Sequence, residues 1–251
     1  MKKWKTKHGC KISRVLSGRS NAYLVQLDNA NFLVDTGTKS AFGKLIRNIH
    51  RLGLSPENLS GLILTHTHFD HCQSARRIKE ISHCRILVSG AARDAVKTGY
   101  TRLPDGTFWI TKGIARLGQW IGARKLGYEP FEPDILIQDH PDLYNLYSKV
   151  QILRTVGHSC DSISIIVDDE IAIVGDTMFG ILKNSIFPPF ADDQQQLIAS
   201  WKDLLKTHCQ WFMPGHGKEI TRNLLQKEYG RYAQKYNQSQ EKNQPSLTYK
   251  I

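Results

Sequence analysis

Residues 65–72 have the sequence Thr-His-Thr-His-Phe-Asp-His-Cys, and they constrain this chain more than any other segment. Four potential metal ligands fall within six residues, in the pattern H-x-H-x-D-H: His66, His68, Asp70 and His71. They follow the apolar run 61–64, which predicts a buried strand that ends at the first ligand. Neutral imidazole and carboxylate suit zinc and related transition metals. Because ligands packed this closely cannot all bind one ion, the pattern predicts two adjacent metal ions.

Three later segments each carry one further candidate ligand, next to glycine and after an apolar run. The candidates are His158 after 150–156, Asp176 after 171–174 and His216 after 211–214. Glycine beside a ligand lets the backbone turn sharply and approach closely. A single histidine after a strand is more often structural than a ligand. Here the three residues share one context, and together with segment 65–72 they predict a complete two-metal site.

The length of 251 residues allows one large domain or two small ones. We expect a single domain over residues 1–251, because the candidate ligands lie between residues 66 and 216 and must meet in one site. With 40% hydrophobic and 23% charged residues, the composition is typical of a globular enzyme.

Hydrophobic spacing predicts strands and helices in alternation. Strands are expected at 22–28, 31–35, 62–65, 85–89, 150–156, 162–167, 171–174 and 211–214, with hairpin turns at 29–30 and 168–170. Helices are expected at 40–52, 71–80, 193–206 and 219–236.

Residues 97–147 break this alternation, and we interpret them as a helical insertion. Apolar residues from Phe108 to Ile121 recur at helical spacing, with basic residues between them. The spacing predicts an amphipathic helix. It is compatible with a lid or pocket wall, a dimer surface, a membrane-surface helix or a helix that simply caps the core.

The ordered set of motifs resembles the metallo-β-lactamase superfamily of hydrolases. The motifs are Asp35-Thr36-Gly37, the H-x-H-x-D-H segment, Gly157-His158, Gly175-Asp176-Thr177 and Pro214-Gly215-His216-Gly217. The resemblance covers nearly the whole chain. It implies a four-layered αβ/βα sandwich, in which two mixed sheets are flanked by helices and the site lies at the edge between them.

The resemblance also implies a role for each ligand. His66, His68 and His158 would hold the first metal, Asp70, His71 and His216 the second, and Asp176 would bridge both. Asp35 would lie behind the metal ligands and position them. Two zinc ions are expected, although iron and manganese accept the same ligand types.

Two metal ions can share a water, lower its pKa and polarise the oxygen of the substrate. We therefore expect a hydrolase that uses a metal-bridging hydroxide. Asp70 and Asp176 are the candidate catalytic residues: both offset the charge of the metals, and Asp70 is also placed to orient the nucleophile or receive its proton.

The motifs look most like the branch of glyoxalase II and the acyl-homoserine lactonases, which implies an ester, thioester or lactone of a small acyl substrate. A phosphodiesterase acting on nucleotide, nucleic acid or phospholipid is the first alternative, and a metal-binding protein without hydrolytic turnover is the second. For contact with the substrate the candidates are Lys183, after the Gly175-Asp176-Thr177 motif, and three aromatic residues of the insertion, Tyr100, Trp109 and Trp120.

The net charge of +11 favours an anionic partner or simply a solvated basic surface. We expect a small-molecule substrate, with an anionic group compatible with this charge. Nucleic acid is not favoured, because no aromatic-rich basic motif accompanies the charge. A homodimer is one alternative for the insertion. The five cysteines form no C-x-x-C pair, and no run is apolar enough for a signal or membrane span. A cytoplasmic location is therefore expected.

Overall fold

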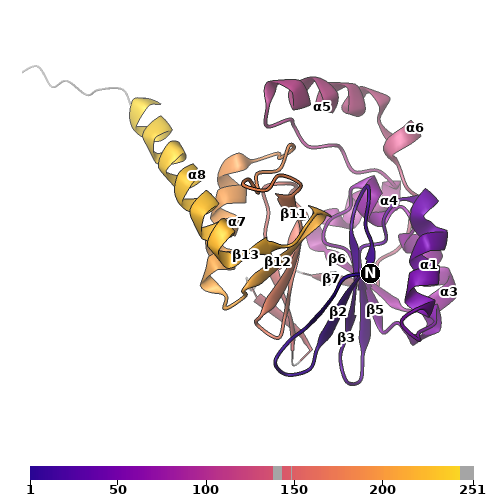
Figure 1. Cartoon of the computed structure of the whole chain (residues 1–251). Coiled ribbons are helices and arrows are strands. Elements are labelled where there is room, and N and C mark those ends of the chain that lie inside the picture. Colours follow the sequence, from indigo (N-terminus) through magenta and orange to yellow (C-terminus); the bar gives the residue numbers. More distant parts are fainter. Residues whose placement is uncertain (138–142, 148, 244–251) are drawn as a thin grey trace, which may run out of the picture.

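The computed structural model describes residues 1–137, 143–147 and 149–243. Two sheets pack face to face, and helices cover their outer faces (Figure 1). The first sheet has seven strands in chain order: β1 (Lys3–Lys5), β2 (Lys11–Leu16), β3 (Ala22–Gln26), β4 (Asn31–Val34), β5 (Gly61–Ile63), β6 (Arg85–Ser89) and β7 (Ile135–Ile137). Strands β1 to β4 are antiparallel neighbours, and β4 to β7 are parallel.

The second sheet has six strands in the order β13 (Ile220–Thr221), β12 (Trp211–Gly217), β11 (Ile171–Gly180), β10 (Ile163–Val167), β9 (Val150–Arg154) and β8 (Leu143–Tyr147). Its neighbouring strands are antiparallel, apart from the parallel pair β11 and β12. Both sheets are therefore mixed, as expected.

The helices are α1 (Phe42–His50), α2 (Phe69–Cys72), α3 (Ala75–Ser82), α4 (Arg93–Thr98), α5 (Trp109–Ile121), α6 (Ala123–Leu126), α7 (Gln194–Lys206) and α8 (Arg222–Asn243). Short 3-10 turns occupy Lys39–Ala41, Pro56–Asn58 and Gly90–Ala92. No helix in the described ranges combines the length and the apolar character that crossing a lipid bilayer requires.

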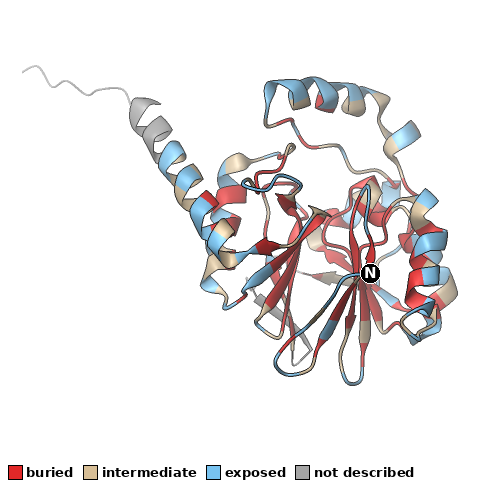
Figure 2. Cartoon of the chain, viewed as in Figure 1, coloured by how far each residue is buried: buried red, intermediate tan, exposed pale blue. Residues whose placement is uncertain are grey.

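Three apolar clusters show why the layers hold together. The central cluster lies between the sheets and joins strands of both, for example Val25 and Ile63 with Ile165 and Ile173. A second packs α1 and α3 onto the outer face of the first sheet. A third packs α7 and the start of α8 onto the second sheet, around the fully buried Trp201. Burial is accordingly concentrated in the sheets and the inner helix faces (Figure 2). This is the predicted helix–sheet–sheet–helix sandwich.

Most predicted elements are confirmed, and the differences have local causes. The expected helix at 71–80 is two helices, α2 and α3, interrupted at Gln73 and Ser74. Strand β11 continues through the Gly175-Asp176-Thr177 motif to Gly180, because it keeps β12 as a partner through two register shifts. The expected turn between β10 and β11 forms with positive φ at both Asp168 and Asp169, as a tight hairpin turn requires.

The segment 97–147 is only partly an insertion. Its helices are α5 and α6, and a hydrogen bond from the backbone N–H of Tyr128 to the carbonyl of Gly99 (2.8 Å) closes this helical excursion. Strands β7 and β8 lie in the same segment but belong to the first and the second sheet, respectively. The proposed boundaries were therefore too wide, because two strands this short carry too few residues to show a period of two.

Candidate metal centre

The candidate ligands all lie at one edge of the sandwich, where strands of both sheets end. His66, His68, Asp70 and His71 follow β5, and the last two lie on the single turn of α2. The other three come from the second sheet: His158 follows β9, while Asp176 and His216 lie within β11 and β12. The central apolar packing of the two sheets therefore positions ligands that are distant in sequence.

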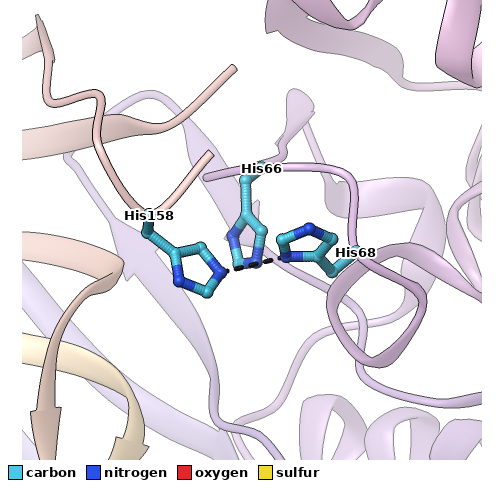
Figure 3. Close-up of side chains that lie close together, drawn as sticks. All are labelled: His66, His68 and His158. Atoms are coloured by element: carbon cyan, nitrogen blue, oxygen red, sulfur yellow. Dashed lines mark hydrogen bonds between the residues drawn. The ribbon is translucent and has the colours of Figure 1, made fainter. Parts of the chain in front are cut away.

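The structure brings all seven candidate ligands together. Their nitrogen and oxygen atoms form three overlapping groups, within each of which the atoms lie no more than 4.8 Å apart. The groups are His66, His68 and His158; His66, His71 and Asp176; and Asp70, His71 and His216. Figure 3 shows the first group, in which His68 Nδ1 and His158 Nε2 are 3.0 Å apart.

Asp176 lies between the two ends of this cluster. Its Oδ2 is 3.6 Å from His158 Nε2 and 3.2 Å from His216 Nε2, and its Oδ1 is 3.3 Å from His71 Nε2. Asp70 lies at the far end, with its Oδ2 3.6 Å from His216 Nε2. One carboxylate thus faces histidines of both expected metal positions, which is the placement that a bridging ligand needs.

Backbone and carboxylate acceptors hold the ligand rings from behind. His158 Nδ1 lies 2.9 Å from the carbonyl of Phe190, and His68 Nε2 lies 3.1 Å from the carbonyl of Arg102. A carbonyl only accepts, so each of these nitrogens is the protonated one. The other ring nitrogen is then left with a free lone pair directed into the cluster, as a metal ligand requires.

Asp35 lies behind two of the candidate ligands. Its Oδ2 lies 2.9 Å from His71 Nδ1 and accepts a hydrogen bond from the hydroxyl of Thr65 (2.8 Å). That hydroxyl lies 3.1 Å from His66 Nδ1. Asp35 therefore orients His71 directly and His66 through Thr65. Its φ of 60° is in the left-handed region, which aspartate tolerates better than most residues.

A second buried carboxylate, Asp161, was not predicted. Its Oδ2 accepts hydrogen bonds from the backbone N–H and the hydroxyl of Thr67 (2.9 and 2.6 Å), and its Oδ1 accepts one from Ser159 (2.6 Å). It thereby joins the ligand segment after β5 to the loop that carries His158. The one sequence signal was its position three residues after a candidate ligand.

Glycine allows the cluster to close at two positions. A Cβ atom at Gly215 would lie 2.2 Å from Asp176 Oδ1 and 2.6 Å from His71 Cε1. A Cβ atom at Gly157, whose φ is +127°, would lie 2.2 Å from the backbone nitrogen of Leu197 in α7. Neither site has room for a side chain, so the glycines beside the ligands are steric requirements.

The cluster separates the histidines into two electrostatic classes. Burial lowers the pKa of His158 to about 4 and that of His66 well below the usual value, and neighbouring imidazoles add to both effects. Burial also opposes charge on His71 and His216, but nearby carboxylates, above all Asp176, outweigh it and raise both pKa values. Although burial works against ionisation of Asp176, these histidines hold its pKa well below the usual range.

The donor set fits metal ions. His66 Nε2 and Asp176 Oδ1 are buried, and neither has a hydrogen-bond partner among the described residues. Buried polar atoms without partners are costly. A cation between the groups would satisfy both atoms, and five imidazoles with two carboxylates suit zinc, iron or manganese.

A cavity of about 360 Å³ lies over the cluster. His68, Asp70, His158, Asp176 and His216 line its floor, and its walls are largely apolar. The wall residues come from α5, from the segments on either side of it, from β11 and from the loop after it: Leu103, Pro104, Ile114, Leu117, Ile121, Leu126, Phe179 and Phe190. The helical excursion thus forms a pocket wall, one of the roles expected for it.

The predicted substrate-binding residues are not part of this lining. Trp109 and Trp120 belong to α5 but are 83% and 84% exposed, and Lys183 is exposed after the end of β11. Tyr100 lies at the start of the excursion and does not line the cavity either. The apolar residues between the two tryptophans take the place expected for them. Arg19, which sequence reasoning missed, lines the cavity as well.

The model of the metallo-β-lactamase superfamily matches residues 17–216, which contain every candidate ligand. The chain belongs to this superfamily. It is 30% identical over 160 residues to a probable metallo-hydrolase of Methanocaldococcus jannaschii, which covers 64% of this chain and 68% of the relative. It is also 28% identical over 202 residues to an uncharacterized protein of Mycobacterium bovis, which covers 75% and 81% of the two chains.

Solved structures agree on the fold of this superfamily hydrolase. A metallo-β-lactamase of Cronobacter sakazakii with a HARLDQ motif has a TM-score of 0.66 at 16% identity, covering 97% of this chain and 96% of its own. A metallo-β-lactamase family protein of Thermus thermophilus has a TM-score of 0.63 at 19% identity, covering 90% and 80%. At identities this low, the comparisons show a shared fold only. The substrate has to be inferred from the site.

Proposed function

We propose that this protein is a dinuclear metal-dependent hydrolase that cleaves the ester, thioester or lactone bond of a small acyl substrate. The observation that carries the proposal is the position of the seven-ligand cluster at the floor of a cavity with apolar walls. Such walls accommodate an acyl chain, while the cluster lies next to the bond to be hydrolysed.

The charge of the cavity supports a substrate with one anionic end. Among the described residues that line it, Arg19 is the one lysine or arginine. It lies beside the Phe69 ring, with 4.9 Å between Arg19 Cζ and the ring centroid. A carboxylate or phosphate attached to the acyl group would pair with this guanidinium.

His66, His68 and His158 would hold one metal ion, Asp70, His71 and His216 the other, and Asp176 would contact both. When bound, the ions lower the pKa of a water and polarise the oxygen of the scissile bond. Asp70 lines the cavity, with its Oδ2 3.6 Å from His216 Nε2, so its carboxylate would orient the attacking water and receive its proton. Asp35 and Asp161 hold the histidine segments in place.

Phosphodiester hydrolysis is the second candidate, and the net charge of +11 favours it. The cavity itself argues for the acyl substrate, because a nucleotide or nucleic-acid site would present several cations to the phosphates. A redox or purely metal-binding role would not require the apolar cavity beside the candidate ligands.

A substrate panel tests the proposal on protein loaded with zinc, iron or manganese. We expect about two metal ions per chain and turnover of acyl thioesters, p-nitrophenyl esters or lactones. Asp176→Ala and His66→Ala should abolish this turnover, whereas Asp28→Asn, at a carboxylate that is 84% exposed, should not. Turnover of bis(p-nitrophenyl) phosphate alone would establish the second candidate instead. Turnover of a β-lactam alone would contradict both.

A further inference from the structure

Exposed apolar side chains are concentrated along α5. Of the ten large apolar side chains exposed in the described part of the chain, six lie between residues 108 and 120. They are Phe108, Trp109, Ile110, Ile114, Leu117 and Trp120. Isolated exposed apolar residues are ordinary, but a contiguous group of this kind marks an interaction surface.

The two tryptophans lie on one face of the helix. They are separated by about three turns, so they project in nearly the same direction about 16 Å apart along the axis. Ile110 and Leu117 lie further round the helix, followed by Ile114, which lines the cavity. A continuous apolar stripe therefore runs from the cavity wall to the outer face of α5. Figure 1 shows that α5 lies at the top of the molecule, set apart from both sheets.

The charged residues of α5 itself are all positive. Lys112 and Arg116 are exposed on α5, next to the two tryptophans. Residues 106–128 contain no aspartate or glutamate and four basic residues, the other two being Arg124 and Lys125. The helix itself thus combines exposed indole rings with cations and carries no carboxylate, and the neighbouring Asp105, which accepts a hydrogen bond from Gln119 (3.0 Å), is already paired with Arg102 (2.9 Å).

We propose that α5 docks onto an anionic phospholipid bilayer and lies in the plane of the membrane interface. A helix with tryptophan and leucine on one side and lysine and arginine beside them binds such interfaces through apolar burial and attraction to anionic headgroups. Tryptophan favours the headgroup level, because its ring is apolar and its N–H finds a polar partner there. The helix rests in the interface and does not cross the bilayer.

The charge distribution favours a bilayer over a second copy of the chain. In a two-fold dimer the same surface appears on both subunits. Pairing α5 with itself would bring Lys112 and Arg116 of each subunit toward those of the other, with no carboxylate on the segment to neutralise them. An anionic headgroup layer supplies the missing negative charge.

Docking in this orientation gives the cavity access to lipid. Ile114 and Leu117 belong both to the cavity lining and to the exposed stripe, so an acyl chain leaving the bilayer would stay in contact with apolar atoms on its way to the ligand cluster. This consequence rests on the proposed function. The docking itself does not, because it can be measured without turnover.

Vesicle co-sedimentation of the full chain tests the docking. We expect binding to vesicles of phosphatidylcholine mixed with phosphatidylglycerol, weaker binding as salt rises, and a blue shift of tryptophan fluorescence. The double variant Trp109→Ser/Trp120→Ser should lower the partition coefficient by at least about tenfold, since two large apolar side chains no longer leave water. Trp211→Ser is the matched control, because Trp211 is a partly exposed tryptophan at the start of β12, in the second sheet.

A second variant separates charge from apolar burial. Lys112→Glu/Arg116→Glu keeps both tryptophans and should lose binding to the anionic vesicles to a similar extent. Circular dichroism and metal content should be unchanged in all variants. The proposal is overturned if wild-type protein does not sediment with anionic vesicles, if the tryptophan variant binds as well as wild type, or if the wild-type chain is a dimer without lipid that these tryptophan substitutions dissociate. A protein that binds vesicles but hydrolyses no substrate would contradict the proposed function alone.

Discussion

Asp35 is a buried carboxylate whose effect on metal binding can be isolated. In Asp35→Asn the side chain keeps its shape, and asparagine tolerates the left-handed backbone conformation found here. In the wild-type protein both carboxylate oxygens accept hydrogen bonds from Thr65, and one of them also lies against His71 Nδ1. The asparagine amide has only one acceptor oxygen for these three contacts. We expect metal affinity to fall roughly 10–100-fold, as for other groups that orient metal ligands.

Competition with a chromophoric chelator measures this change. Asp28→Asn is the control, because Asp28 is an exposed carboxylate with one long ion pair to Lys149 (3.7 Å). If Asp35→Asn bound metal as tightly as wild type, His71 and His66 would not depend on Asp35 for their orientation.

Gly215 is the residue whose substitution should damage the site most directly. Alanine would place a Cβ atom against Asp176 Oδ1 and His71 Cε1, and neither side chain can move without leaving the cluster. We expect Gly215→Ala to lose the metal that His71 helps to hold, and activity to fall by at least about 10²-fold, the cost of a misplacement near 1 Å. Metal analysis and turnover of the best ester substrate measure both effects.

Gly230→Ala is the matched control for this substitution. Gly230 lies in α8 with no atom near the added methyl group, so alanine should stabilise the helix by about 0.5–1 kcal/mol and leave activity unchanged. An active, fully metallated Gly215→Ala protein would show that the backbone there can shift, contrary to the close approach described.

Helices and strands with a long apolar pattern could be predicted from the sequence. The apolar runs of β3 and β4, joined by a short turn, and the helical spacing in α1 predicted these elements correctly. The edge strands β1, β7, β8 and β13 were missed, and so was β2, because in strands of two to six residues tertiary pairing outweighs local pattern. The candidate ligands could be identified from the sequence because histidine and aspartate are residue types that bind metal ions.

The pocket wall shows the opposite case. The apolar period of 108–121 predicted α5, but it did not indicate which face would turn toward the site. Trp109 and Trp120 were expected to line the pocket, and the structure places smaller aliphatic residues of the same segment there instead. Arg19 reaches the same cavity from the loop between β2 and β3, a contact that no local pattern encodes.

Helix α7 begins with an aspartate cap at its N-terminus. Asp193 caps it: the carboxylate Oδ1 accepts hydrogen bonds from the N–H groups of Gln195 (2.8 Å) and Gln196 (3.0 Å). The backbone of Asp193 also donates to the carbonyl of Gly157, beside His158. We expect Asp193→Ala to lower the free energy of unfolding by about 0.5–2 kcal/mol, measured by urea denaturation.

The contribution of this cap depends on pH in a known direction. The backbone hydrogen bonds lower the pKa of Asp193, so its stabilisation is present above the ordinary aspartate value and is lost as pH falls through the lowered one. The difference between wild type and Asp193→Ala should therefore shrink in acid. Asp203→Ala, at an exposed ion pair with Lys206 on the same helix, should change stability by less than about 0.5 kcal/mol at any pH.

The candidate ligands come from both sheets of the sandwich. His66 and His71 follow β5 of the first sheet, while His158 follows β9 of the second sheet and Asp176 and His216 lie within its strands β11 and β12. Metal ions held between them would add a tie between layers that otherwise meet through apolar packing. A metal ion that binds only the folded state stabilises it, by ~2.7 kcal/mol at a free metal concentration one hundred times Kd. Metal-loaded protein should therefore unfold at a higher temperature than protein treated with a chelator.

The size of this difference should increase with pH. In the metal-free protein the pKa values of His71 and His216 are raised by Asp176, so their favourable charge is fully present below the ordinary histidine value of ~6.5 and is lost as pH rises through the raised values. In the loaded protein the same imidazoles are already neutral, and metal affinity itself rises as protons stop competing. The loss of these protons therefore widens the gap in unfolding temperature between loaded and chelated protein from pH 6.5 to pH 9.

All titrating groups outside the site are common to the two forms, so their effects cancel in the gap. Calorimetry of both forms across this pH range measures it, and the Asp35→Asn variant provides the comparison, because one of the two carboxylates facing His71 is then neutral. A gap that stayed constant or narrowed with rising pH would mean that His71 and His216 are not charged in the metal-free fold. The electrostatic division of the cluster into two classes of histidine would then be wrong, even with every ligand in place.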